Sequence, residues 1–167
     1  MAIERLMVAA PLTSTEVGEE YSSLPPHMTL FPWFDMPRAN WTSFNAAMHH
    51  LLVETVQPTI SGGDAATFGG EQDPSEVRRL NVATPTFNII HGFDIHAGVH
   101  NAVRRYGGDF DPRYVGTRWK PHVTSTQDFA LENGDEVRLE EIAVFQRSTV
   151  AGIKMVKAVY KWEDPSL

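Results

Sequence analysis

A four-residue pattern, Pro-His-x-Thr, occurs twice in this chain of 167 residues and constrains its fold more than any other feature. The copies are Pro26–Thr29 and Pro121–Thr124, and their histidines, His27 and His122, lie 95 residues apart. Each copy follows a loop and begins an apolar stretch that is typical of a β-strand. Because each copy is accompanied by its own predicted helix and hairpin, the repeat indicates two lobes of similar design.

The rest of the chain predicts strands mixed with two helices. Apolar stripes at helical spacing predict a helix over residues 41–56 and a second, less regular one over 86–106. Short apolar runs between turn residues predict strands at 3–10, 27–34, 57–61, 65–69, 76–83, 118–126, 137–148 and 153–162. This mixture indicates an α+β domain, and the absence of a linker makes residues 1–167 one unit.

Composition excludes cysteine chemistry. The chain has no cysteine, so disulfides, thiolate metal sites and cysteine nucleophiles are ruled out. The first five residues lack a basic region followed by a long apolar one, and no run of about 18 apolar residues occurs, so neither a secretory signal nor a membrane span is expected. We therefore expect a cytoplasmic protein without membrane contact, and take a monomer as the default.

The net charge of −7 argues against a surface for long nucleic acid. Proteins that grip a duplex usually carry a basic stripe that neutralises its phosphates. Here lysine and arginine occur only in ones and twos, as in Arg78–Arg79, Arg104–Arg105, and Arg118 with Lys120. A nucleic-acid substrate is therefore expected to be a nucleotide or a short RNA end, not duplex DNA.

The two motifs carry side chains that suit phosphate-ester chemistry. Alternation along a strand places His27 with Thr29 on one face, and His122 with Thr124. If the strands face each other across a groove, one neutral imidazole can take a proton from the attacking water or hydroxyl, while the other, protonated, gives one to the leaving oxygen. The hydroxyls can hold the non-bridging oxygens. We predict these four residues as catalytic, either histidine in either role, with no metal or other cofactor.

Four stretches resemble the two-histidine (2H) phosphoesterase superfamily, which includes the bacterial RNA 2′,3′-cyclic phosphodiesterases often called 2′-5′ RNA ligases. They are an opening strand at 5–9, the first motif at 24–30, a Phe-Gly segment at 66–70 and the second motif at 119–124. The resemblance implies two pseudo-symmetric lobes, each with an antiparallel sheet lining a central groove and a helix on the outside. It also implies cleavage of a phosphodiester, with a 2′,3′-cyclic phosphate as the leading substrate.

Two positions depart from the family pattern. The RNA cyclic phosphodiesterases often place an arginine three residues after the second threonine, where this chain has Gln127, and a leucine directly after it, where this chain has Ser125. Hydrolysis of 2′-5′ linkages or of cyclic oligonucleotide signals is therefore an alternative. A catalytically silent RNA-end binder is another, although the presence of all four motif residues favours catalysis.

Four residues near the motifs are predicted to bind substrate: Trp33, Lys120, Tyr114 and Arg118. The tryptophan shares strand parity with the first motif and can stack on a base, although core packing is its commoner use. The lysine shares parity with the second histidine and can attract phosphate, unless it is simply solvated. The tyrosine and the arginine lie on the approach to the second motif, where a loop can contact substrate.

Three other histidines suggest a competing interpretation. His96 and His100 lie four residues apart on the second predicted helix, so they can share a face, and with His91 they could bind zinc. The acidic partner and the catalytic glutamate of the known helical zinc motif are missing. The sequence therefore favours a site without metal, and activity is expected to survive a chelator.

Overall fold

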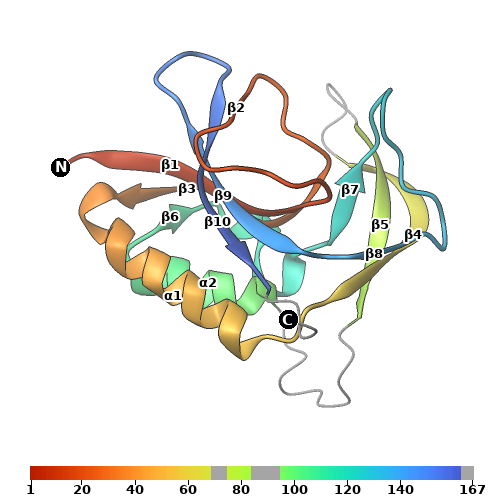
Figure 1. Ribbon diagram of the computed structural model, residues 1–167, viewed down its shortest axis with the longest axis horizontal. Coiled ribbons are helices and arrows are strands. Elements are labelled where there is room, and N and C mark those ends of the chain that lie inside the picture. The colour runs from red at the N-terminus through yellow and green to blue at the C-terminus, as the bar shows by residue number, and fades with distance from the viewer. Residues whose placement is uncertain (69–74, 84–94, 163–167) are drawn as a thin grey trace.

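The computed structural model describes residues 1–68, 75–83 and 95–162 as an antiparallel sheet with two α-helices against it (Figure 1). The strands are β1 (Ile3–Pro11), β2 (Glu20–Tyr21), β3 (His27–Pro37), β4 (Thr59–Phe68), β5 (Ser75–Ala83), β6 (Asp109–Phe110), β7 (His122–Thr124), β8 (Glu136–Arg138), β9 (Glu141–Arg147) and β10 (Lys154–Lys161). The helices are α1 (Trp41–Glu54) and α2 (Ile95–Arg105), and the 3-10 turns are η1 (Arg38–Asn40), η2 (Pro112–Tyr114) and η3 (Gly116–Arg118).

The sheet runs continuously through both motifs. Within the described residues its strands follow the order β2-β10-β9-β1-β3-β7-β5-β4-β8, and β6 pairs with β3 off this path. The first motif begins β3 and the second forms β7, and these two strands are neighbours. β7 therefore joins the larger part of the sheet to β5, β4 and β8, which lie together on the right of Figure 1.

The main core fills the space between one face of the sheet and the helices. α1 buries Phe44, Met48 and Leu52, whose spacing of four residues forms one face of the helix. The sheet contributes alternate residues of β3 and β1, such as Met28 and Leu6, both with no exposed surface. The opposite face of the sheet carries a smaller apolar cluster, formed by Met7, Ala9, Ala143, Phe145 and Val156.

Both described helices pack on the same part of the sheet, α1 against β10 and α2 against β3, and they also contact each other (Figure 1). This differs from the expected single outer helix on each lobe. The position of α2 is explained by β6, which directly follows α2 in the chain and pairs with β3. Because β3 leads into α1, this pairing brings α2 beside α1. The pseudo-symmetry of two lobes stays a prediction. Neither of these helices is long and apolar enough to cross a membrane.

The predicted strand at 137–148 is wrong in one respect, because the structure divides it into β8 and β9. The chain passes here from pairing with β4 to pairing with β1. Leu139 marks the crossing: it is buried, and its N–H donates to the carbonyl of Pro58. Elsewhere, α1 confirms the first predicted helix, and the two strands predicted at 57–61 and 65–69 are replaced by one, β4 (Thr59–Phe68). Residue 69 and the predicted helical residues 86–94 lie outside the described residues.

Candidate active site

The two motifs lie side by side at the centre of the sheet. Met28 of β3 pairs directly with Val123 of β7, and both side chains are buried in the core. Because side chains alternate, the residues that flank each of them project from the opposite face. Continuing the antiparallel register places His27 opposite Thr124, and Thr29 opposite His122. The four motif side chains therefore form a two-by-two array, in which the histidines occupy one diagonal, a separation of about 7–8 Å.

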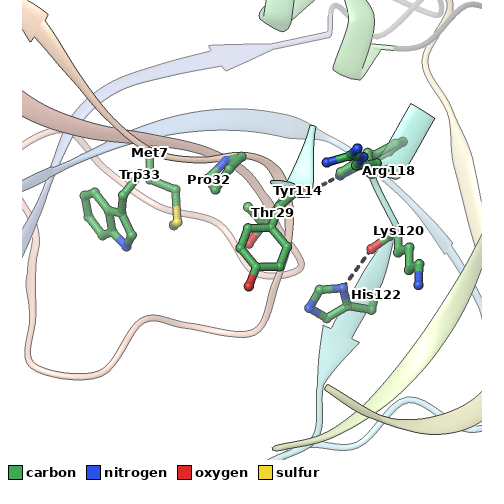
Figure 2. Close-up of a pocket in the computed structure, with 9 residues that line it drawn as sticks. Met7, Thr29, Pro32, Trp33, Tyr114, Arg118, Lys120 and His122 are labelled. Atoms are coloured by element: carbon green, nitrogen blue, oxygen red, sulfur yellow. Dashed lines mark hydrogen bonds between the residues drawn. The ribbon is translucent and has the colours of Figure 1, made fainter. Parts of the chain in front are cut away.

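Each catalytic histidine candidate is held by the same kind of hydrogen bond. Nδ1 of His27 lies 2.7 Å from the carbonyl oxygen of Pro25, and Nδ1 of His122 lies 2.8 Å from that of Lys120, drawn as a dashed line in Figure 2. A carbonyl only accepts, so Nδ1 carries the proton in both rings. Nε2 is then the nitrogen that can exchange a proton with a ligand.

The repeated proline explains why the two hydrogen bonds match. In each copy the accepting carbonyl belongs to the residue before a proline, Pro26 or Pro121. Proline fixes its own φ and holds the preceding residue in an extended conformation. The carbonyl two residues before each histidine is therefore presented to the ring in the same way at both sites.

The local electrostatics favour one protonation state of His27. Burial lowers the pKa of His27 below its usual value, and the charge of a protonated His122 lowers it further, while the hydrogen bond to Pro25 acts in the opposite direction. His27 is therefore held as the neutral imidazole near neutral pH. A neutral ring that is protonated on Nδ1 presents an unprotonated Nε2, which is the form that a general base needs.

A cavity of about 290 Å³ opens beside His122 (Figure 2). Its lining contains all four residues that the sequence predicts to bind substrate, together with one motif residue from each strand. The lining residues are Met7, Thr29, Pro32, Trp33, Tyr114, Arg118, Trp119, Lys120 and His122. His27 and Thr124 are not among them, because they occupy the other row of the motif array. The cavity is of a size that takes a small ligand, and it ends at the candidate catalytic groups.

Trp33 reaches this cavity through two irregularities in β3. The β1–β3 register shifts on either side of Val8, and each shift adds one residue to β3. As a result Leu30 and Phe31 are both buried in the core, while Pro32 and Trp33 both line the cavity. Two added residues restore the original alternation of faces along β3. Simple alternation therefore predicts the correct face for Trp33.

His96 is the residue whose role the sequence does not reveal. Its Nδ1 donates to the carbonyl of Leu30 at 2.6 Å, and its Nε2 accepts from the N–H of Gly116 at 2.8 Å. Its ring stacks on Trp119 at 4.6 Å between centroids, and on Phe31 at 6.0 Å. The buried imidazole thus ties α2 to β3 and to the turn that leads to Arg118 and Lys120.

These contacts bear on the zinc interpretation. Both nitrogens of His96 are engaged by the backbone, so metal ligation would break one of these bonds. His100 packs against Phe31 and Phe110, and burial, together with the charge of Arg104, lowers its pKa. His91 lies outside the described residues. Across residues 1–68, 75–83 and 95–162 no three histidine or carboxylate side chains are grouped so that they could hold a metal ion.

The arrangement of strands and helices matches solved structures along nearly the whole chain. LigT from E. coli, in a crystal structure with NADP+, superposes with a TM-score of 0.59 at 13% identity, over 96% of this chain and 98% of LigT. This chain has the LigT fold. TT0787 from Thermus thermophilus gives 0.58 at 15% identity, over 96% of this chain and 99% of its own, and a structure described as a phosphoesterase gives 0.56 at 14%, over 98% and 100%.

The expected resemblance is confirmed as a likeness of fold, to LigT and to a structure described as a phosphoesterase. In sequence the relationship is distant, and no family model and no curated protein matches the chain. Other LigT structures that share the fold were solved with 3′-AMP and with ATP, at TM-scores of 0.57 and 0.53.

Proposed function

We propose that this protein is a metal-independent phosphodiesterase that hydrolyses 2′,3′-cyclic phosphates at RNA ends or on nucleotides. The observation that carries the proposal is the pairing of Met28 with Val123, which gathers both histidines and both threonines on one face. A binder that never catalysed would need neither two imidazoles on a diagonal nor matched hydrogen bonds on their Nδ1 atoms.

His27 is the base in this proposal, because its environment keeps it neutral. Its Nε2 takes a proton from water, whose oxygen attacks the phosphorus as the bond to one ribose oxygen breaks. His122, protonated at the start of the turnover, gives its Nε2 proton to that departing oxygen. One water is consumed and a phosphomonoester is formed. The two rings then exchange protons with solvent and return to their starting states.

Thr29 and Thr124 complete the phosphate site. Each hydroxyl lies opposite a histidine in the motif array and can donate to a non-bridging oxygen, where negative charge builds up during attack. Trp33 and Tyr114 give the adjoining cavity aromatic surfaces on which a base can stack, while Arg118 and Lys120 supply positive charge. The nucleotides in the LigT crystal structures, NADP+, 3′-AMP and ATP, support a nucleotide as the occupant.

A substrate panel tests the proposal. We expect 2′,3′-cyclic nucleotides or RNA with a cyclic end to be hydrolysed in the presence of EDTA, ahead of 2′-5′ oligoadenylate and cyclic dinucleotides. Binding of the same RNA ends without turnover would establish the silent binder instead. Loss of activity in EDTA that zinc or manganese restores would contradict the metal-independent mechanism.

A further inference from the structure

The register between β5 and β7 places a cation beside the second histidine. Arg79 pairs directly with His122. Residues opposite each other on antiparallel strands project from the same face, with Cβ atoms about 5 Å apart. Arg79 therefore shares the face that carries the four motif side chains. Its neighbour Arg78 pairs with the buried Val123 and points the other way.

The two arginines differ in what holds them. Arg78 donates to the carbonyl oxygens of Leu131 and Gly63 and approaches the carboxylate of Glu132 at 3.7 Å, so its charge serves the fold. Arg79 is exposed, and in the described parts of the chain its guanidinium has neither a hydrogen bond nor an ion pair. An arginine without a protein carboxylate, beside a phosphate site, is available to an anionic ligand.

The position of Arg79 in the sheet indicates which anionic group of a ligand it can reach. Across the three adjacent strands, Thr29, His122 and Arg79 form one row, with successive strands about 4.8 Å apart. The cavity is lined from β1, β3 and residues 114–122, which include Arg118 and Lys120, whereas Arg79 lies on β5, across β7 from β3. Arg118, Lys120 and Arg79 thus bring positive charge next to the motif array, although the chain as a whole carries −7.

We propose that Arg79 binds a second phosphate of the substrate, next to the one that reacts. The inference rests on the proposed function and narrows its substrate class: an oligonucleotide of two or more nucleotides with a cyclic end is preferred over a cyclic mononucleotide. A mononucleotide places its only phosphate over the histidines and leaves Arg79 without a partner. A longer substrate offers this guanidinium a charge-assisted hydrogen bond.

The test compares two substrates that differ by one nucleotide, and hence by one internal phosphodiester: adenosine 2′,3′-cyclic phosphate, and the dinucleotide ApA ending in a 2′,3′-cyclic phosphate. In Arg79→Gln we expect kcat/KM for the dinucleotide to fall about tenfold, mainly because KM rises. A tenfold loss corresponds to the low end of the range for a hydrogen bond to a charged group. The mononucleotide should change by less than about twofold, since it lacks that hydrogen bond. Arg79→Lys should restore part of the loss. Arg138→Gln, which removes an exposed arginine from β8, is the matched control and should leave both substrates unchanged.

Salt dependence gives a second readout. The slope of log kcat/KM against log salt for the dinucleotide should become shallower by about 0.7 in Arg79→Gln, one phosphate contact on a single strand. An equal loss on both substrates would mean that Arg79 contacts the reacting phosphate, and no loss on either would mean that it is merely solvated; each result overturns the proposal.

A binding measurement separates this inference from the proposed function. Calorimetry with the uncleavable ligands 3′-AMP and ApA 3′-phosphate should show a preference for the dinucleotide that Arg79→Gln abolishes. If the wild-type protein hydrolyses neither cyclic substrate but shows this preference, the proposed function fails and the role of Arg79 stands. If the wild-type protein hydrolyses both cyclic substrates without preference, the proposed function stands and the role of Arg79 fails.

Discussion

Replacing His96 with alanine tests how the turn η3 (Gly116–Arg118) is held. The substitution removes the donor to the Leu30 carbonyl, which lies in a residue with no exposed surface, and this costs about 1–3 kcal/mol. It also takes a ring from between Trp119 and Phe31, and the gap costs about 2–5 kcal/mol if it does not collapse. The N–H of exposed Gly116 can donate to water once the ring is gone, so the loss of its hydrogen bond to His96 adds no further cost.

Together these losses lower the free energy of unfolding by about 4 kcal/mol, taking the lower part of each range because water can enter beside the turn. For a chain of this size that corresponds to a fall in Tm of roughly 12 °C. KM should rise as well, because the turn that His96 holds contains Arg118 and leads to Lys120, both proposed to bind substrate. Thermal and urea unfolding, with steady-state kinetics on the folded fraction, measure both effects.

Two comparisons make the test specific. His96→Asn keeps an amide donor near the place of Nδ1 and should recover about 1 kcal/mol. His100→Ala, four residues along the same helix, loses ring contacts with Phe31, Phe110 and His96 but no hydrogen bond to the described residues, and should cost less than half as much as His96→Ala. A His96→Ala protein within about 1 kcal/mol of wild type, or one matched by His100→Ala, would refute the role of the two hydrogen bonds.

Three further predictions concern the site and the fold around it. Because the pKa of His27 is lowered in the folded state, only the unfolded chain protonates this imidazole as the pH falls below about 6.5. The free energy of unfolding should therefore decline until the pH reaches the lowered pKa, and His27→Gln should flatten that decline in unfolding curves. Thr29→Ala and Thr124→Ala should each lower kcat by about tenfold, less than loss of a histidine, because one hydrogen bond among several is removed; stopped assays on the best substrate of the panel would show it. Glu4→Ala should cost about 3 kcal/mol in urea unfolding, because Lys157, paired with it at 3.0 Å and mostly buried, loses its carboxylate, and a loss under 1 kcal/mol would contradict this.

Much of the site follows from alternation within a strand. His27 and Thr29 share a face because they are two residues apart, and the same holds for His122 and Thr124. That β3 and β7 are neighbours, with Met28 opposite Val123, depends on long-range pairing, for which the repeated motif is only an indirect sign. Alternation therefore predicts which motif side chains share a face, whereas their arrangement across β3 and β7 comes from the fold.

The features that sequence reasoning misses depend on contacts between distant segments. His96 meets Leu30 across 66 residues and Gly116 across 20, and no local pattern encodes either hydrogen bond. The sequence marks His96 only by its spacing of four residues from His100, the feature behind the zinc interpretation. The division of β8 from β9 has the same origin, because Leu139 marks where one continuous apolar run changes its pairing partners.

The most direct test of the central claim is the kinetics of the two histidine variants. We expect His27→Ala and His122→Ala each to lose about 10²–10⁴-fold in kcat/KM while circular dichroism shows an intact fold, because neither ring can act as base and acid in the same turnover. His50→Ala, an exposed histidine on α1, is the matched control and should behave as wild type. A folded His122→Ala protein with near-wild-type turnover would make the second motif structural and contradict the two-histidine mechanism.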